Sequence, residues 1–525
     1  MATLQAVIPR LESSPAIITP GAASVSFSLL DRHVKSVRSF LASLGLRPQS
    51  AIAIALPNSL EFAVVFLAVT YSGFVAAPLN PGLKQAEFEF YLQDLRCPVA
   101  FVSANESEAV VNAAGKIGKF VEGGHVKMFT IVASSSGDND TAVKLCGIDG
   151  NAIIGNDSKA KMPEAHADDV ALVLHTSGTT GRPKIVPLTH VNLTTSIRNI
   201  TQTYGLEQAD RSLLVMPLFH VHGLLCGFLA PLSVECAVIV PARFSASSFW
   251  HDFVEHGATW YTAVPTIHQI LLKTPGPPVL PKIRFIRSCS SALAPSTMRL
   301  LEDRFHAPVV EAYAMTEACH QMTSNEIPPG VRKPGSVGKA QGSVSVKVLD
   351  QDGLEVGRGV EGEICVKGGN VTKGYRNNKA ANDTSFTKTG YFRTGDQGKM
   401  DEDGFVFITG RIKELINRGG EKISPVELDS VLLEHGAVAE AVSFGVPDEM
   451  YGQEVQAAVV VKAGVAEDEG TEKQLIEFMM DRVARFKVPK KIYFTKEMPK
   501  TATGKIQRKH IADLFFPRPQ ARAKV

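Results

Sequence analysis

The sequence predicts an α/β protein with a large first domain of mixed sheets flanked by helices and a smaller α+β domain at its C-terminal end. A length of 525 residues exceeds what one hydrophobic core accommodates, so two or more domains are expected. Short apolar runs alternate with helical patterns, and after Pro334 alternating segments with glycine turns indicate a β-rich subdomain. We place the boundary at residue 410, which gives a large domain of residues 1–410 and a small domain of residues 411–525.

Each expected element follows from a local pattern. Strands are expected where short apolar runs lie between polar or proline-rich loops. These runs are Ala51–Ala55, Val99–Val102, Val170–Leu174, Ala237–Val240 and Ile283–Ile286. Helical patterns lie between them, for example at Ala86–Leu95 and Ser296–Phe305. In the β-rich subdomain we expect strands at Val344–Leu349 and Gly362–Val366.

One uncharged segment, Phe62–Leu83, is long enough to span a bilayer. Polar and turn-forming residues interrupt it, namely Ser72, Gly73, Pro78, Asn80 and Pro81. Its second half has the pattern of a strand followed by a turn. We therefore expect a buried helix and strand here, and no membrane insertion.

Composition and charge are those of an ordinary soluble enzyme, with 44% hydrophobic and 21% charged residues. The 55 basic and 53 acidic residues give a formal net charge of +2. That balance gives no reason to expect nucleic acid or an acidic membrane as a partner. No obligate protein partner is indicated either.

The seven cysteines form no Cys-x-x-Cys pair, so neither a disulfide framework nor a thiolate zinc site is indicated. The N-terminus lacks the basic and apolar blocks of a secretory signal. We therefore expect a reduced, cytoplasmic protein. The last residues, Ala523-Lys524-Val525, are similar to a peroxisomal tail, but Val525 stands where leucine is usual, so the peroxisome is the less favoured compartment.

The most informative stretch is His175–Lys184 (HTSGTTGRPK), which follows the expected strand Val170–Leu174. Gly178 and Gly181 allow backbone angles that turn several N–H groups toward one point. Hydroxyl donors and one positive charge are added by Thr176, Ser177, Thr179, Thr180 and Lys184. Such a nest suits the phosphates of a nucleotide, although no Gly-Lys-Ser/Thr triplet closes it as in a Walker A loop. A flexible surface hairpin is the alternative.

Five further motifs follow along the chain. They are Pro217–His222 (PLFHVH), Tyr313–Glu317 (YAMTE), Tyr391–Asp396 (YFRTGD), Gly410–Gly420 (GRIKELINRGG) and Lys500–Lys505 (KTATGK). Taken singly, each has a purely structural interpretation. The histidines are then core residues, Thr316 and Glu317 begin a helix, Asp396 occupies a glycine turn, and Lys505 is a solvated loop lysine. Together and in this order the motifs are highly specific.

With the glycine-rich loop, these motifs resemble the adenylate-forming superfamily of acyl-CoA synthetases, luciferases and peptide-synthetase adenylation domains, from about Phe27 to Arg508. Within it, the chain is most similar to the plant oxalate–CoA ligases of the 4-coumarate–CoA-ligase-like group. Three stretches carry that closer similarity: Trp260–His268, Ser288–Leu293 and Met315–His320. Ile185 departs from the family, which usually has glycine after the loop lysine. A β-branched residue fits the start of a strand, so we expect little effect on phosphate binding.

The resemblance implies an acid–CoA ligase that uses ATP, Mg²⁺ and CoA and passes through an acyl-adenylate. It implies that Lys505 contacts both the acid and the α-phosphate, that Glu317 helps to hold Mg²⁺, and that Thr316 donates to the α-phosphate. His220 would lie at the gate of the acyl site and complete the catalytic set. The resemblance also implies that the small domain is mobile and rotates about a hinge at Lys413. This rotation would bring the CoA-binding residues to the tunnel for CoA, namely Gly419, Gly420 and Lys422.

The resemblance further implies a set of nucleotide contacts. Among them, Asp396 would bind the ribose hydroxyls with Arg411 beside it, and the segments 290–292 and 311–313 would flank the adenine. The whole set is Thr176, Ser177, Gly178, Thr179, Thr180, Lys184, Ser290, Ser291, Ala292, Glu311, Ala312, Tyr313, Thr316, Asp396, Arg411 and Lys505.

The acid site is expected to be polar, with His220, Ser291 and His320 as its binding residues. A protonated histidine would pair with a second carboxylate, and a buried polar wall would penalise an alkyl chain. The hypothesis is therefore a very small diacid, oxalate first. Malonate is the nearest competing substrate, whereas a hydroxycinnamate-type or fatty acid would require an apolar pocket. In another interpretation, Ser290 and Ser291 contact only the adenine and the backbone. A non-catalytic adenylate-binding protein is the remaining alternative.

Overall fold

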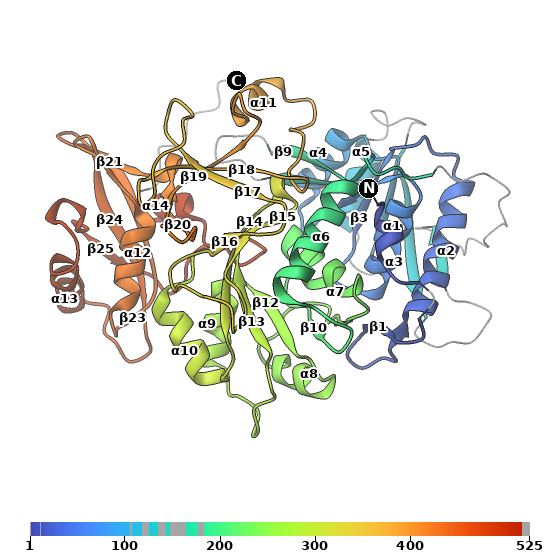
Figure 1. Cartoon of the computed structure of the whole chain (residues 1–525), viewed down its shortest axis with the longest axis horizontal. Helices are drawn as coiled ribbons and strands as arrows, with labels where there is room; N and C mark the ends of the chain where they lie inside the picture. Colours follow the sequence, from blue (N-terminus) through green and yellow to red (C-terminus); the bar gives the residue numbers. More distant parts are fainter. Residues whose placement is uncertain are drawn as a thin grey trace.

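The computed structural model describes residues 2–10, 12–104, 108–117, 125–134, 143–147, 164–176 and 183–516. Within these residues the strands form four sheets of seven, nine, four and five strands (Figure 1). The two large sheets pack against each other through helices. The four-stranded sheet follows them in the chain, and the five-stranded sheet belongs to the C-terminal unit.

The seven-stranded sheet has the order β7-β6-β5-β3-β4-β8-β9, parallel inside and antiparallel at both edges. Its strands are β3 (Ala51–Ala55), β4 (Val75–Pro78), β5 (Val99–Val102), β6 (Lys127–Ala133), β7 (Val143–Gly147), β8 (Val170–Thr176) and β9 (Lys184–Thr189). Successive residues of β3 point to opposite faces, so the isoleucines enter the central core and the alanines pack against the outer helices. The outer helices are α4 (Gln85–Leu95) and α5 (Glu108–Ile117), and the inner helices are α2 (Phe27–Ser43) and α3 (Leu60–Tyr71).

The nine-stranded sheet has the order β16-β15-β14-β13-β12-β10-β11-β1-β2 and a parallel centre. Its strands are β1 (Pro15–Ile18), β2 (Val25–Ser26), β10 (Arg211–Leu213), β11 (Ala237–Ile239), β12 (Trp260–Ala263), β13 (Phe285–Cys289), β14 (Val309–Met315), β15 (His320–Ser324) and β16 (Lys339–Ala340). The helices on its two faces are α6 (His190–Tyr204), the π-helix η2 (His222–Leu229) and α7 (Ala230–Leu232) on the inner face, and α8 (Phe249–Glu255), α9 (Pro265–Lys273) and α10 (Pro295–Phe305) on the outer face.

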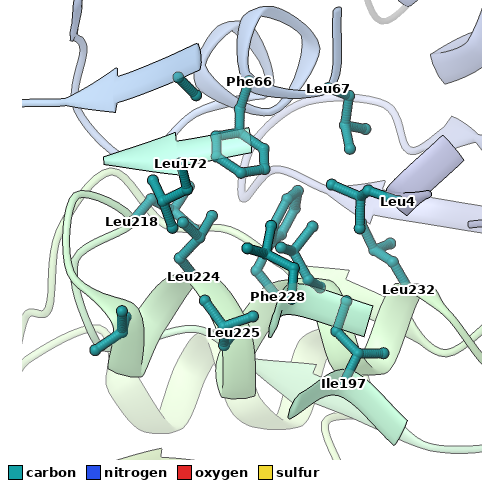
Figure 2. Close-up of a cluster of buried hydrophobic side chains, with 14 of the residues drawn as sticks. Leu4, Phe66, Leu67, Leu172, Ile197, Leu218, Leu224, Leu225, Phe228 and Leu232 are labelled. Atoms are coloured by element: carbon teal, nitrogen blue, oxygen red, sulfur yellow. The ribbon is translucent and has the colours of Figure 1, made fainter. Parts of the chain in front are cut away.

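A continuous apolar core joins the two large sheets. Figure 2 shows Phe66 of α3 facing Leu224 and Phe228 of η2, with Leu4 of the short helix α1 (Leu4–Val7) beside them. All of these side chains are buried. Burial of apolar surface on both sides of this layer fixes η2, and therefore the residues at its start, against the first sheet.

The remaining strands form two smaller sheets. The antiparallel four-stranded sheet contains β17 (Ser345–Leu349), β18 (Gly362–Lys367), β19 (Phe392–Met400) and β20 (Val406–Arg411), with α11 (Lys379–Ser385) before β19. The C-terminal unit contains β21 (Ile416–Arg418), β22 (Glu421–Ile423), β23 (Val438–Asp448), β24 (Gly452–Val461) and β25 (Ile492–Phe494), with α12 (Pro425–Glu434), α13 (Glu469–Met480) and α14 (Arg508–Phe515). Single 3₁₀ turns are η3 (Thr316–Ala318), η4 (Ile412–Glu414) and η5 (Arg485–Lys487).

The predicted fold class is confirmed, including the β-rich sheet after Pro334 and the mixed C-terminal unit. The uncharged segment Phe62–Leu83 forms a buried helix and strand, as expected, and no described helix is long and apolar enough to cross a membrane. All seven cysteines are unpaired. The domain boundary at residue 410 stays a prediction, and the tail Ala523-Lys524-Val525 lies outside the described residues.

Two local predictions were wrong. The strand expected at Ile283–Ile286 is β13, which begins at Phe285 and continues through polar residues to Cys289, because β12 and β14 pair with it there. Asp396 was assigned to a turn but lies in β19, where it pairs with Arg411 of β20. Gly395, with φ +75, supplies the local irregularity that suggested a turn.

Candidate active site

The predicted phosphate loop lies between β8 and β9, whose ends pair at Thr176 and Lys184. Its residues Ser177, Gly178, Thr179 and Thr180 lie outside the described residues. The Lys184 ammonium is 4.5 Å from the ring centroid of Tyr375. Lys184, at the end of the loop, therefore lies beside Tyr375.

Glu317 lies on the 3₁₀ turn η3, between β14 and β15, and is buried. The hydroxyl of Tyr375 donates to its Oε1 at 2.8 Å. Burial raises the pKa of Glu317, and the hydrogen bond from Tyr375 and the charges of Lys184 and Arg411 oppose that shift. The Glu317 carboxylate is thus oriented by the neutral hydroxyl of Tyr375, and the charges of Lys184 and Arg411 act on it.

Asp396 is the second buried carboxylate of this side of the site. Arg411 Nε donates to its Oδ1 at 2.9 Å, and the hydroxyl of Tyr313 donates to its Oδ2. Asp396 therefore has its own cation within the protein. Nearby, Glu311 of β14 accepts from the backbone N–H of Leu293 at 2.9 Å, and burial raises its pKa to about 8. This bond ties β14 to the turn that follows β13.

Three histidines and one serine meet on the other side of the site. The ring of His222 stacks on that of His320 with 5.2 Å between centroids. His222 Nδ1 lies 3.1 Å from Ser290 Oγ, and the His222 backbone N–H donates to His220 Nδ1 at 3.3 Å. Both ring nitrogens of His320 are buried, and no described residue forms a hydrogen bond with them. A buried polar group without a partner costs free energy, so this pair of nitrogens is an expected ligand contact.

Backbone strain accompanies these side chains. Ser290 has φ +77 and His320 has φ +91, a region that side chains other than glycine rarely adopt. Such strain concentrates at functional sites. The π-helix η2 is a third unusual feature. At its start, a Cβ on Gly223 would lie 2.3 Å from the Pro217 carbonyl oxygen, so only glycine fits there. Glycine at this position lets the chain fold tightly enough to direct His220 and His222 toward β13 and β15.

Arg287 lies behind the histidines, in the middle of β13, and is completely buried. Its guanidinium donates to Tyr204 Oη at 2.7 Å, Gln321 Oε1 at 3.0 Å and Thr262 Oγ1 at 3.1 Å. A fourth contact, at 3.4 Å, is to His222 Nε2. None of these acceptors is a carboxylate.

Lys505 reaches the site from the C-terminal unit. Thr266 at the start of α9 donates to the carbonyl of Gly504 at 3.0 Å, which docks the lysine loop on the large domain. Gly504 has φ +82, and a Cβ there would lie 2.9 Å from the Thr266 hydroxyl, so the contact requires glycine. Within the described residues no hydrogen bond or salt bridge engages the Lys505 ammonium, whose pKa is lowered by burial and then by Arg411.

The surroundings of the three histidines favour their neutral form. Burial, and after it the charge of Lys505, lowers the pKa of His220 to about 3. Burial also lowers the pKa values of His222 and His320 well below their ordinary range, with Arg287 and Lys505 contributing. We had expected a protonated histidine. The pKa values instead favour neutral rings that act as N–H donors.

Comparisons with known proteins identify the family. The AMP-binding enzyme model matches residues 5–376, and the AMP-binding enzyme C-terminal domain model matches residues 427–505. The chain belongs to the AMP-binding enzyme family. It is 49% identical over 478 residues to the oxalate–CoA ligase of Saccharomyces cerevisiae, covering 89% of this chain and 87% of the relative. It is 44% identical over 523 residues to the oxalate–CoA ligase of Arabidopsis thaliana, covering 98% of each.

Solved structures of AMP-binding enzymes support the fold. The structure of ATP-bound MatB from Rhodopseudomonas palustris matches with a TM-score of 0.85 and 29% identity, covering 98% of both chains. The resemblance to the adenylate-forming superfamily is therefore confirmed. The individual site residues stay predictions.

The predicted CoA-binding and hinge residues of this AMP-binding enzyme are apart from the other site residues. Gly419 and Gly420 form the turn between β21 and β22, and Lys422 is exposed on β22. Figure 1 shows β21 at the outer side of the C-terminal unit, away from β14 and β15. Lys413 is exposed on the 3₁₀ turn η4 that joins β20 to β21. This one-turn connection is where the hinge was predicted.

The structure brings most of the other predicted residues together. Thr316 and Glu317 lie on η3, Ala312 and Tyr313 lie on β14, and Ala292 is exposed after β13. Ser291 is also exposed, and its hydroxyl donates to the carbonyl of Ser290. The serine that contacts the histidines is Ser290.

Sequence reasoning missed three residues of this site. His222 had a signal, because it shares a motif with His220. Arg287 interrupts an apolar run, which marks it only as an unusual strand residue. Tyr375 carried no signal, since its contact with Glu317 joins segments 58 residues apart.

Proposed function

We propose that this AMP-binding enzyme ligates oxalate to CoA at the expense of ATP, through an oxalyl-adenylate, and releases AMP and pyrophosphate. The observation that carries the proposal is the set of groups on the acid side that an anion can complete. Within the described residues, the ring nitrogens of His320 and the Lys505 ammonium have no hydrogen-bond partner, and the guanidinium of Arg287 has no carboxylate partner. A small, doubly charged acid satisfies such a site, whereas an alkyl chain leaves it unpaired. The curated oxalate–CoA ligases of yeast and Arabidopsis support the same substrate.

In the first step, a carboxylate oxygen of oxalate attacks the α-phosphorus of ATP. A new O–P bond forms, and the bond to the oxygen that bridges to the β-phosphate breaks. The obstacle is that two anions must meet, which costs about 4 kcal/mol per like-charge pair at about 4 Å and an effective dielectric constant near 20. The Lys505 ammonium offsets this repulsion, because it is held by the Gly504–Thr266 contact and has no other partner among the described residues.

The nucleotide occupies the side of the site with Glu317 and Asp396. Asp396, oriented by Arg411 and Tyr313, would accept hydrogen bonds from the ribose hydroxyls. A single carboxylate together with substrate phosphates is a common way to hold Mg²⁺, so Glu317 fits this ion, which would neutralise phosphate charge when bound. Within the described residues no cluster of three or more His, Cys, Asp or Glu side chains could hold a metal by itself.

In the second step, the CoA thiolate, which has already lost its proton, forms a C–S bond to the oxalyl carbon. The C–O bond to AMP breaks, and AMP leaves with the electron pair. Lys505 must leave first, because it lies on the acid side where the thiol has to arrive. Rotation of the small domain about Lys413 would remove it and bring in Gly419, Gly420 and Lys422. The short 3₁₀ turn η4 contains Lys413 and would take up the change in backbone angles. We place this reaction in the cytoplasm, with small molecules as its partners, which fits seven unpaired cysteines.

The test is pyrophosphate and AMP release over a panel of acids, with and without CoA. The panel contains oxalate, malonate, acetate, 4-coumarate and octanoate. Oxalate should have the highest kcat/KM, and oxalyl-CoA should form only when CoA is present. A better rate with malonate, 4-coumarate or octanoate would reject oxalate as the substrate, and no AMP with any acid would reject the ligase activity.

A further inference from the structure

Arg287 is a buried cation without a counter-ion. Its side chain is completely buried in β13, and within the described part of the chain no salt bridge reaches it. Tyr204, Gln321, Thr262 and His222 surround it with neutral groups only. An uncompensated buried charge is expensive, so a charge in this position requires a function.

The contacts of Arg287 also determine which nitrogen of His222 carries the proton. A guanidinium only donates, so His222 Nε2, at 3.4 Å from Arg287, must present its lone pair. The Thr262 hydroxyl, at 2.6 Å, accepts from Arg287 and can therefore donate to the same nitrogen. The proton of the neutral ring is then on Nδ1.

The tautomer of His222 in turn orients Ser290. His222 Nδ1–H donates to Ser290 Oγ, at 3.1 Å. Since that oxygen already accepts from His222, the Ser290 hydroxyl directs its own hydrogen away from His222. The series of contacts from Arg287 through His222 to Ser290 thus ends in a hydroxyl group that can donate to the ligand.

We propose that Arg287 is the positioning residue that makes the acid site specific for a dianion: it fixes His222 as the Nδ1–H tautomer, so that Ser290 donates, and its charge compensates the carboxylate of oxalate that does not react. The proposal rests on the proposed function and adds to it. It differs from a purely structural role, in which Arg287 only holds Tyr204 and Gln321 together and has no effect on the charge of the acid.

The test compares oxalate with oxamate, which has nearly the same shape but carries an uncharged amide in place of the second carboxylate. The variant Gln321→Glu gives Arg287 a carboxylate at the position of its present acceptor, without removing the arginine. We expect its kcat/KM for oxalate in pyrophosphate release to fall by about tenfold or more, because the charge that oxalate meets is neutralised. The value for oxamate should change far less, and the KM for ATP should stay the same.

Gln341→Glu is the matched control. It adds the same charge to the same network, but Gln341 accepts from Thr203 and has no contact with Arg287. We expect its oxalate-to-oxamate ratio to equal that of the wild type. An unchanged ratio in Gln321→Glu, or an equal loss in both Glu variants, would overturn the proposal.

Arg287→Met and Arg287→Lys provide a second measurement. Loss of the charge should lower the oxalate-to-oxamate ratio in Arg287→Met, and Arg287→Lys should restore part of it. Equal loss of both substrates in Arg287→Met, with no difference between Met and Lys, would overturn the proposal. If Arg287→Met fails to fold, Gln321→Glu still decides, because it keeps Arg287 and its other three partners, Tyr204, Thr262 and His222. A wild type that does not adenylate oxalate would instead reject the proposed function.

Discussion

The two sides of the candidate active site differ in how their charges are balanced. On the nucleotide side, Asp396 has Arg411 as its ion-pair partner, and Glu317 accepts from Tyr375. On the acid side, Arg287 has no carboxylate partner and the ring nitrogens of His320 have no hydrogen-bond partner among the residues that the structure describes. The nucleotide side is complete within the protein, whereas the acid side is completed by its ligand.

This difference shows where specificity for the acid arises. A buried cation without a partner raises the free energy of the empty site, and an anion that binds there recovers that free energy. The penalty is therefore largest for an acid that lacks the second charge. The same reasoning predicts that substitutions on the acid side change the acid preference, while those on the nucleotide side change the KM for ATP.

The largest expected effect comes from removing the positive charge of Lys505. Lys505→Ala should lower the rate of pyrophosphate release from oxalate and ATP by about a hundredfold to a thousandfold, as expected for loss of one charged contact in the transition state. Thioester formation from preformed oxalyl-adenylate and CoA should be spared. Lys500→Ala is the control, because Lys500 belongs to the same loop but pairs with Glu440. Equal loss in both half-reactions would contradict the two-step use of Lys505.

A pair of adjacent serines provides the next comparison. Ser290→Ala should raise the KM for oxalate by about tenfold, because a hydrogen bond to a charged group is lost. Ser291→Ala should leave it unchanged, since Ser291 is exposed and contacts only a backbone carbonyl. Both variants should keep the KM for ATP. A raised KM for oxalate in Ser291→Ala with an unchanged KM in Ser290→Ala would instead assign the acid-binding role to Ser291, in agreement with the prediction from the sequence.

The lowered pKa of Lys505 predicts a difference in pH dependence. Burial, followed by Arg411, lowers this pKa from 10.5, so adenylation should decline as the pH rises through the lowered value and the ammonium loses its proton. Thioester formation from oxalyl-adenylate should not share this decline. Lys505→Arg, whose charge persists above pH 12, should shift the alkaline limb of its remaining adenylation activity upward. Identical alkaline limbs in the two half-reactions would be evidence against Lys505 as the cation.

The last prediction concerns the pH dependence of stability, and it depends on a buried histidine of α2, His33, which lies outside the candidate site. Within the described ranges no residue forms a hydrogen bond with either ring nitrogen of His33, and burial lowers its pKa to about 4. The unfolded chain then binds a proton below pH 6.5 and the folded chain does not. Stability is therefore full above pH 6.5 and falls by about 1.4 kcal/mol per pH unit toward pH 4. Urea unfolding at pH 7.5 and 5.0 should show a smaller difference for His33→Leu than for the wild type; an equal difference would show that His33 does not titrate this way.

The fold could be predicted from the sequence wherever local pattern determined structure. Strands β3 and β5 were predicted with their observed ends, because apolar runs flanked by loops are visible in the sequence alone. The end of β13 was not, since Arg287 and Ser288 continue a strand only because distant residues bond to the guanidinium and β12 and β14 pair with the backbone.

The candidate site could be predicted where motifs carry the chemistry. The expected roles of Lys505, Glu317 and Asp396 come from the resemblance that the ordered motifs carry, and His320 was proposed because it lies three residues beyond Glu317. The choice between Ser290 and Ser291 depends on a positive φ angle and on a contact with His222 from another element. No pattern of neighbouring residues contains that information.

The central claim is that the acid side is completed by a dianion. The most direct test is calorimetric binding of oxalate and oxamate to the wild-type protein with Mg²⁺ and α,β-methylene-ATP, which cannot release pyrophosphate. We expect oxalate to bind at least about tenfold more tightly than oxamate, in keeping with the loss of a close charge pair. Equal affinities would contradict the claim, because the second charge of the acid would then contribute nothing.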